Sequence, residues 1–252
     1  MSTPSRIPFV TLAFVMALAA TVSAADGKRA FTIEDLYDVK TPTSPEVSPD
    51  GQSVVYTLTT SDIRAVKRTT NLWQVDASGG EPHRLTAAEA SDSSPAFSPG
   101  GTSLAFLSTR SGGAQLWLLP TRGGEPEKRT SFPGGISHPV WSPDGTSIAL
   151  TAEVWPDSGA DAKCNRERDE ARAKGKLKAH LADELLFRHW NSWRDGKVSH
   201  ILLFDLETSE LTDLTPGGFD APAWDLGGSR GYAFSPDGKE LVFTSNHDPK
   251  PA

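Results

Sequence analysis

The sequence predicts an all-β fold made of a repeated four-stranded unit, and three observations indicate this. A phrase ending in Ser-Pro-Asp-Gly or Ser-Pro-Gly-Gly occurs four times, each time before an apolar run. Glycine-rich turns divide each unit into short segments with strand character. The serines of the phrase are spaced by 50, 44 and 93 residues, at Ser48, Ser98, Ser142 and Ser235. Because periods in the forties to fifty are typical of propeller blades, we predict a partial β-propeller of about three and a half four-stranded blades.

The second unit shows the expected order of strands. Its first strand ends at Ser98, and Pro99–Thr102 forms a tight turn in which glycine accepts a positive φ. The hairpin that follows is apolar enough for a sheet covered on both faces. A polar outer strand follows Pro126. The proline fits this position, because a missing amide hydrogen is tolerated at a sheet edge. The expected strands are residues 95–98, 104–108, 115–119 and a segment ending at 130, and the first unit repeats this order through 71–75 and 83–86.

The third unit contains a long insertion, because the interval from Ser142 to Ser235 is two periods long. We place this insertion at residues 152–197. Its segment Lys163–Asp183 is rich in Lys, Arg, Glu and Ala and contains no proline, which favours a helix. The blade is expected to resume at Ser199–Asp205, where a regular apolar strand returns.

The end of the insertion, Asp183–Trp193, crowds carboxylate, cationic and aromatic side chains into eleven residues. If the helix continues through it, Glu184 and Arg188 share one face, and a second face carries Leu185, His189 and Trp193. One interpretation is a helix end docked on the blade by a salt bridge and a buried tryptophan. The other is a substrate-binding site, because a carboxylate binds a free α-amino group and an arginine orients a carbonyl or carboxylate. The candidate substrate-binding residues are Glu184, Arg188, His189 and Trp190.

Composition excludes some classes of partner and ligand. The 252 residues are 37% hydrophobic and carry a formal net charge of −7, and no basic stripe favours nucleic acid. The six histidines fall in no spacing typical of a zinc site, and the paired glycines precede Glu-Pro in turns instead of forming a phosphate loop. We therefore predict no cofactor and no metal. Cys164 is the single cysteine, so it cannot form a disulfide within the chain.

The N-terminus has the pattern of a secretory signal peptide. Arg6 precedes an apolar stretch from Phe9 to Ala20, and small residues lead to Ala24. This stretch is too short to span a membrane, so we predict cleavage near residue 24 and a protein that is periplasmic or secreted. The predicted organisation is a signal peptide at 1–24 and a partial propeller at 25–252, with no membrane attachment after cleavage.

Several of these features together resemble a known family. The Ser-Pro-Asp-Gly repeats, the opening Phe31–Leu36, the insertion ending Arg188-His-Trp190 and the segment Asp220–Trp224 are similar to the N-terminal β-propeller of prolyl oligopeptidase family serine peptidases. The resemblance covers nearly all of the chain after the signal, and its branch is that of dipeptidyl-peptidase V and acylaminoacyl-peptidase-like enzymes. Since TolB-type periplasmic propellers share the repeats, the Arg-His-Trp insertion is the more specific part.

The resemblance implies a C-terminal α/β-hydrolase domain with a Ser-Asp-His triad, whose mouth the propeller covers. This sequence is expected to stop before that domain, so we predict no catalytic residue within it and no activity alone. Gly227–Gly231 fits G-x-S-x-G around Ser229, with Asp237 and His247 following in order. However, a nucleophile elbow requires a strand before the serine and a helix after it, and here a repeat strand follows.

Two classes of function stay open. The first is the substrate-gating propeller of a secreted serine exopeptidase that acts on peptide N-termini, with the peptide bound through the catalytic domain. The second is a TolB-like propeller that binds a partner protein and catalyses nothing. An open ring would leave blade faces uncovered, so we expect the chain alone to be marginally stable, dimeric through those faces or aggregated. The sequence does not predict the native oligomeric state or the cleavage-site preference.

Overall fold

The computed structural model describes residues 29–176, 179–180, 188–189, 192–193, 196–223, 231–245 and 247. The chain divides into two compact units, Met1–Val39 and Lys40–Ala252. The described part of the first unit holds one turn of helix, α2 (Asp35–Asp38). The Asp35 carboxylate accepts the backbone N–H of Thr32 at 2.7 Å and pairs with the Arg29 guanidinium, which fixes that turn.

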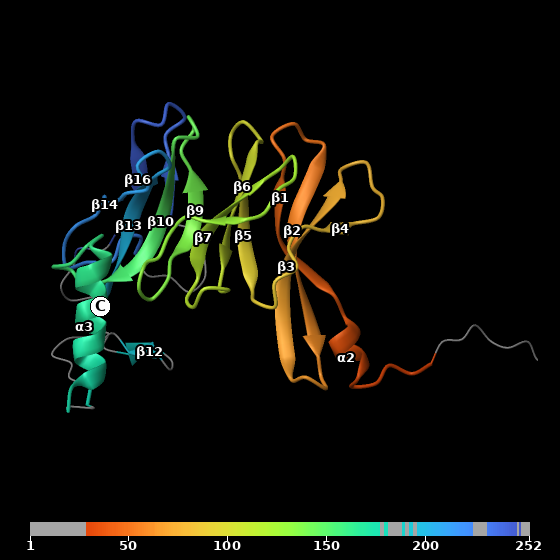
Figure 1. Ribbon diagram of the computed structural model, residues 1–252, viewed down its shortest axis with the longest axis horizontal. Helices are drawn as coiled ribbons and strands as arrows, with labels where there is room; N and C mark the ends of the chain where they lie inside the picture. The colour runs from red at the N-terminus through yellow and green to blue at the C-terminus, as the bar shows by residue number, and fades with distance from the viewer. Residues whose placement is uncertain are drawn as a thin grey trace, which may run out of the picture. The chain divides into compact units, whose positions relative to one another are not determined.

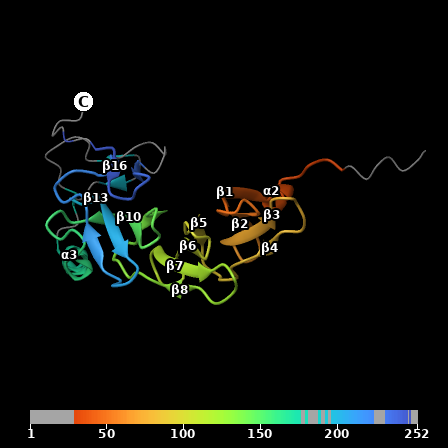
Figure 2. The same cartoon turned by 90° about the horizontal axis from the view of Figure 1, so that it is seen from above.

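The second unit consists of antiparallel sheets that follow one another along the chain (Figures 1 and 2). The first blade is β1 (Thr41–Val47), β2 (Ser53–Asp62), β3 (Lys67–Asp76) and β4 (His83–Arg84), hydrogen-bonded in that order. The second is β5 (Asp92–Phe97), β6 (Ser103–Ser108), β7 (Gln115–Pro120) and β8 (Glu127–Lys128). The third is β9 (Ser137–Trp141), β10 (Ser147–Val154), β13 (Val198–Asp205) and β14 (Leu211–Asp213). The hairpin of β15 (Tyr232–Phe234) and β16 (Leu241–Phe243) begins a fourth, so the predicted partial propeller is confirmed.

The four Ser-Pro turns are built alike and stack from blade to blade. Each closes on a glycine whose φ lies between +67° and +72°, a region that favours glycine. A Cβ added to Gly101, Gly145 or Gly238 would lie 3.4–3.5 Å from the proline ring of the preceding blade's turn. These ring contacts, made by Pro49, Pro99 and Pro143, place all the turns at one end of the blades.

A buried threonine lies two residues after the outer strand of each complete blade. Its Oγ1 accepts a backbone N–H of the third strand at 3.0 Å, and the three pairs are Thr86 with Leu72, Thr130 with Leu116 and Thr215 with Ile201. The third strand carries a buried polar residue just before the N–H donor, namely Asn71, Gln115 and His200. Since a buried polar group without a partner is costly, this recurring bond secures the short outer segments to their blades.

The core lies between successive blades. Side chains alternate between the two faces of a strand, so one face of each blade packs on the blade before it and the other on the blade after it. Val55 and Leu72 of the first blade contact Leu104 and Phe106 of the second. The corresponding interfaces join Ala105, Leu107 and Leu116 to Ile148, Leu150 and Leu202, and Ala149 and Ile201 to Tyr232 and Leu241. The Trp141 indole N–H also donates to the Ala96 carbonyl across blades, at 3.0 Å.

The helix of the insertion is shorter than predicted. Strand β10 continues to Val154, and α3 (Ala162–Lys174) ends at Gly175. Glycine is a poor helix former, and Asn165 is the helix's one buried residue, so no apolar face supports further turns. Beyond it, β11 (Arg188–His189) pairs with β12 (Ser192–Trp193) as a small hairpin. A helix that continues through Arg188, His189 and Trp193, the arrangement considered from the sequence, is therefore not formed.

Candidate functional site

The connections that differ most between blades lie at one end of the propeller, which we call the insertion end. Strands β2, β6 and β10 start just after the Ser-Pro turns and run away from them. Their connections to β3, β7 and β13 therefore lie at the opposite end, where α3 projects in Figure 1. The second blade has only a short turn there, at 109–114, whereas the first has a longer hairpin and the third has the insertion.

The first part of the insertion is anchored on the blade by a buried asparagine. The Asn165 side chain is fully buried, and its Oδ1 accepts the Trp155 backbone N–H at 2.9 Å. Its Nδ2 donates to the carbonyls of Gly159 and Asp161, both at 2.9 Å. The Asp161 carboxylate also accepts two N–H groups of the first helical turn, so it is the N-cap of α3. The Asn165 and Asp161 side chains together thus satisfy the backbone groups around the start of the helix.

A cluster around Trp155 holds the helix against the chain that returns to the blade. The Trp155 indole N–H donates to Asp169 of α3 at 2.9 Å. Lys197, just before β13, pairs with the same carboxylate at 2.7 Å, and its ammonium lies 5.9 Å from the indole ring centre. The Arg168 guanidinium lies 5.3 Å from that centre. Both ends of the insertion are therefore joined through one aromatic ring and one carboxylate.

The predicted binding residues are only partly placed by the structure. Glu184 and Trp190 lie outside the described residues. Arg188 and His189 form β11, where Arg188 is the register partner of Trp193. The Trp193 ring stacks on the His180 ring with centroids 4.1 Å apart and planes inclined by 3°. Trp193 of the hairpin thus stacks on a histidine that precedes the hairpin, a contact that the helical interpretation did not anticipate.

The second blade presents a fixed cation at the insertion end. Arg110 follows β6 and contacts Asp92 at 3.0 Å, and the Asp92 side chain is fully buried. The Nε of Arg110 donates to Ser108 Oγ at 2.8 Å, and the Arg110 guanidinium lies 4.6 Å from the centre of the Trp117 ring. Trp117 and Trp141 pack against the apolar clusters between blades.

A buried ionisable pair, His200 and Asp213, lies in the third blade. His200 Nδ1 is 2.7 Å from Asp213 Oδ2, and its Nε2 is 3.0 Å from the Gly217 carbonyl. Burial lowers the pKa of His200. The hydrogen bond and charge of Asp213, together with the hydrogen bond to the Gly217 carbonyl, raise it by more than burial lowers it, so the pKa lies above the ordinary value. This pair was not predicted from the sequence. Asp213 occupies the position that Arg84 has in the first blade.

The G-x-S-x-G sequence is not continued by a helix. Ser229 lies outside the described residues, but Gly231 leads directly into β15, as predicted. Asp237 belongs to the fourth Ser-Pro turn, where its carboxylate accepts the Ser235 hydroxyl at 2.6 Å. The His247 ring stacks on Phe219, with centroids 3.9 Å apart. Asp237 and His247, the residues that follow Ser229 in the order of a triad, thus each have a different contact.

Two further properties of the described residues bear on the class of protein. Nowhere in these ranges do three or more His, Cys, Asp or Glu side chains gather closely enough to hold a metal ion. None of the helices in the described part of the chain has the length and apolar character needed to span a bilayer.

Comparison with known proteins relates the chain to propellers and peptidases. Residues 39–159 match the family model of the TolB beta propeller domain. Dipeptidyl-peptidase 5 of Porphyromonas gingivalis is 29% identical over 203 residues, which cover 79% of this chain and 28% of that protein. The uncharacterized peptidase YuxL of Bacillus subtilis is 30% identical over 220 residues, covering 87% of this chain and 32% of that protein. The chain thus spans about three-tenths of the length of these curated relatives.

Solved structures agree on the fold. The acylaminoacyl peptidase of Pyrococcus horikoshii matches with a TM-score of 0.56 at 16% identity, over 83% of this chain and 33% of that chain. Fold and matches together define the chain as a β-propeller protein. It is related to the N-terminal propeller of prolyl oligopeptidase family peptidases, which confirms the resemblance predicted from the repeats and the insertion.

Proposed function

We propose that this chain is the substrate-gating propeller of a secreted serine exopeptidase and that its insertion end binds the N-terminus of a peptide. The observation that carries the proposal is the insertion between β10 and β13, which the first two blades lack. Its base is fixed by Trp155 and Asp169, and its far part bears the stacked His180 and Trp193 rings. A rigid base can position a binding segment with little loss of conformational entropy on binding.

The residues of the insertion suit a peptide end chemically. Glu184 supplies a carboxylate for a free α-amino group, and Arg188 supplies a guanidinium for a peptide carbonyl or carboxylate. His189 and Trp190 add flat surfaces for a side chain of the peptide. In this proposal, residues 1–24 direct export, and the protein acts on peptides in the periplasm or outside the cell.

The test is a comparison of substrates in the peptidase that carries this propeller. We expect Glu184→Gln to raise KM for peptides with a free N-terminus more than for N-acetylated peptides, because only the former present a cation to the carboxylate. Glu167→Gln is the matched control, since Glu167 lies on the exposed side of α3 and its contact to Lys163 is 3.8 Å. An equal change in KM for both substrate classes would contradict the proposal and leave Glu184 as a structural residue.

A second candidate is a non-enzymatic propeller that binds a partner protein. The match of residues 39–159 to the TolB beta propeller domain favours it, since these residues include the first two blades completely. In that case the insertion has no role in peptide binding. Glu184→Gln, or a substitution at Arg188, His189 or Trp190, would then leave the affinity for free and blocked peptides unchanged.

A further inference from the structure

The connection that leads from one blade to the next is held by the same kind of bond in all three complete blades. A carbonyl two residues after each buried threonine accepts a hydrogen bond from a buried polar side chain of the third strand. The three bonds join Asn71 to Ala88 at 3.1 Å, Gln115 to Phe132 at 2.8 Å and His200 to Gly217 at 3.0 Å. Because these side chains are buried, water does not readily replace a donor that is lost there.

The donor in the third blade differs chemically from the other two. Asn71 and Gln115 donate through amide groups, which do not titrate. An imidazole ring carries two N–H groups only when it is protonated. His200 faces an acceptor at each ring nitrogen, because Nδ1 lies 2.7 Å from Asp213 Oδ2 and Nε2 lies 3.0 Å from the Gly217 carbonyl. Both bonds together therefore require the imidazolium form.

The Asp213 carboxylate is held in place by its surroundings. Its Oδ1 accepts the Thr215 backbone N–H at 3.0 Å, and its Oδ2 faces His200. The same Oδ2 lies against Gly159 at the base of the insertion, since a Cβ added to this glycine would be 2.6 Å from it. The carboxylate therefore has little room to turn away from the ring.

The charges around His200 favour its protonated form. Asp213 on β14 and Asp220 in the connection both act on the ring through their negative charge, and β10 places the apolar Ala152 as its register partner. Burial lowers the pKa of His200, but the two carboxylates and the Gly217 carbonyl raise it by more. The ring therefore gives up its proton at a pH above the ordinary value of 6.5.

Loss of this proton breaks one of the two bonds, and the chemistry of the acceptors decides which. A hydrogen bond to a carboxylate is stronger than one to a neutral carbonyl. The remaining N–H therefore stays on Nδ1 of His200, facing Asp213. Nε2 then presents a lone pair to the Gly217 carbonyl oxygen at 3.0 Å, and two acceptors at this distance repel each other.

We propose that deprotonation of His200 releases the connection after the third blade, residues 216–221, while the base of the insertion stays in place. The corresponding connections of the first two blades remain closed, because amide groups hold them. The propeller thus contains a joint between blades that opens as the pH rises. This switch is independent of the peptide binding proposed above, because its contacts lie within the third blade and the connection.

Hydrogen exchange of individual backbone amides tests the switch. The Ala221 N–H donates to the Ser199 carbonyl at 2.7 Å and reports on the connection. We expect its protection factor, corrected for the intrinsic effect of pH, to fall by about tenfold or more between about pH 6 and pH 9. The Phe132 N–H, which donates to Gln115 at 2.9 Å, should keep its protection factor. So should the Trp155 N–H at the base of the insertion.

Two substitutions should remove the switch in different ways. His200→Gln supplies an amide donor like those of the other two blades, so the protection of Ala221 should no longer depend on pH. Asp213→Asn should have the same effect, because its amide oxygen keeps the Thr215 N–H and its NH2 group faces Nδ1 of the ring. The neutral ring then carries its proton on Nε2 and keeps the bond to Gly217.

The outcomes separate a local switch from general opening. His83→Gln is the matched control and should keep the pH dependence at Ala221, because His83 is exposed on β4. A constant protection factor of Ala221 in the wild type would overturn the proposal, and so would a pH dependence that persists in His200→Gln or Asp213→Asn. An equal fall at Ala221 and Phe132 would also overturn it, since the propeller would then open as a whole. No peptide is used, so these results stand apart from the proposed function.

Discussion

His200 links the stability of the third blade to pH. The protonated ring can donate to both Asp213 and the Gly217 carbonyl, and its pKa in the folded chain is raised above 6.5. A raised folded pKa means that this contribution to stability is fully present below pH 6.5 and is lost as pH rises through the folded pKa. We predict that the free energy of unfolding, measured with urea between about pH 6 and pH 9, falls over this window.

Two substitutions separate His200 from other titrating groups. His200→Gln introduces the residue type of Gln115, which occupies the same place in the second blade and donates to the Phe132 carbonyl at 2.8 Å. This variant should lose the pH dependence of unfolding above pH 6.5. His83→Gln should keep it, because His83 is exposed on β4. An unchanged slope in His200→Gln would refute the assignment.

The sequence indicates the His200–Asp213 pair only when the third repeat is compared with the first. In the first blade, Arg84 donates to the Asn71 side chain at 2.6 Å. In the third, Asp213 and His200 stand at these two positions, with the charged residue changed from donor to acceptor. Such paired changes are visible in the sequence once the register is known. The register depends on the hydrogen bonds of Thr86 and Thr215, which composition and period do not reveal.

At the scale of elements, we predict that Asn165 holds the whole of α3 in place. Asn165→Ala removes the acceptor for the Trp155 N–H and the donor to two carbonyls. Leaving such groups unsatisfied costs about 1–3 kcal/mol. Tryptic cleavage within Ala162–Lys174, which is rich in Lys and Arg, should therefore accelerate by about tenfold or more, since local proteolysis follows the population of the open state.

The blades themselves should be little affected by this change. Glu167→Ala is the control, because the exposed pair with Lys163 contributes little. It should be cleaved at the wild-type rate. If Asn165→Ala instead lowered the melting temperature of the whole unit without faster cleavage in α3, the helix would be part of the core and not an anchored attachment.

The start of α3 was more predictable than its end. Composition indicated a helix from Lys163, and the capping Asp161 precedes it in the sequence. Its end depends on Gly175 and on the absence of apolar contacts, and absence of packing has no sequence signature. The inner strands show the same limit, since Ser44, Ser94 and His138 all adopt positive φ just before a proline. These bulges recur in every complete blade, and the proline after each one marks its place in the sequence without revealing the positive φ.

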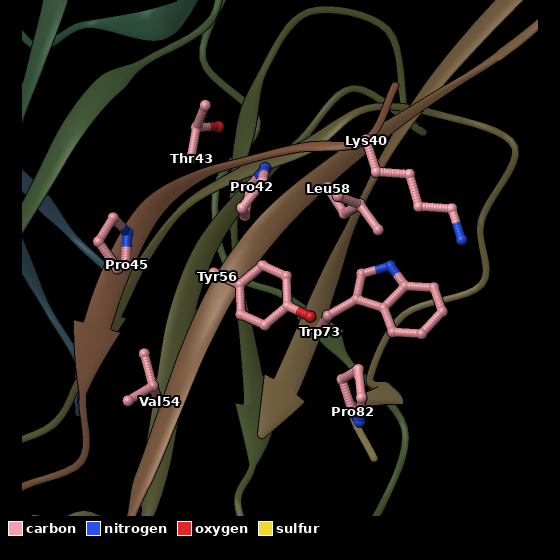
Figure 3. Close-up of a pocket in the computed structure, with 9 residues that line it drawn as sticks. All are labelled: Lys40, Pro42, Thr43, Pro45, Val54, Tyr56, Leu58, Trp73 and Pro82. Carbon is pink, nitrogen blue, oxygen red and sulfur yellow. The ribbon is translucent and has the colours of Figure 1, made fainter. Parts of the chain in front are cut away.

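At the scale of the molecule, the period predicted the number of blades because each unit carries its own turns. The repeat period could not predict which face of each blade is covered, because that depends on the blades next to it. Trp73 illustrates this, since it occupies the strand position that Trp117 has in the second blade but lines a hollow of the first blade. This hollow of about 480 Å³ lies beside β1, β2 and β3, and Figure 3 shows the rings of Tyr56 and Trp73 next to each other in it. The same residue type in the same strand position thus meets either a blade or an open surface.

Register-equivalent residues should therefore differ sharply in their contribution to stability. Phe106 is fully buried between the first two blades, so Phe106→Ala should lower the free energy of unfolding by about 3–5 kcal/mol through the cavity it leaves. Leu150→Ala should cost about 2–5 kcal/mol for the same reason. Tyr56, which corresponds to Phe106 and Leu150 when counted from the Ser-Pro turns, lines the open hollow, so Tyr56→Ala should cost less than about 1 kcal/mol. Urea unfolding measures all three, and a loss at Tyr56 as large as that at Phe106 would contradict an open face on the first blade.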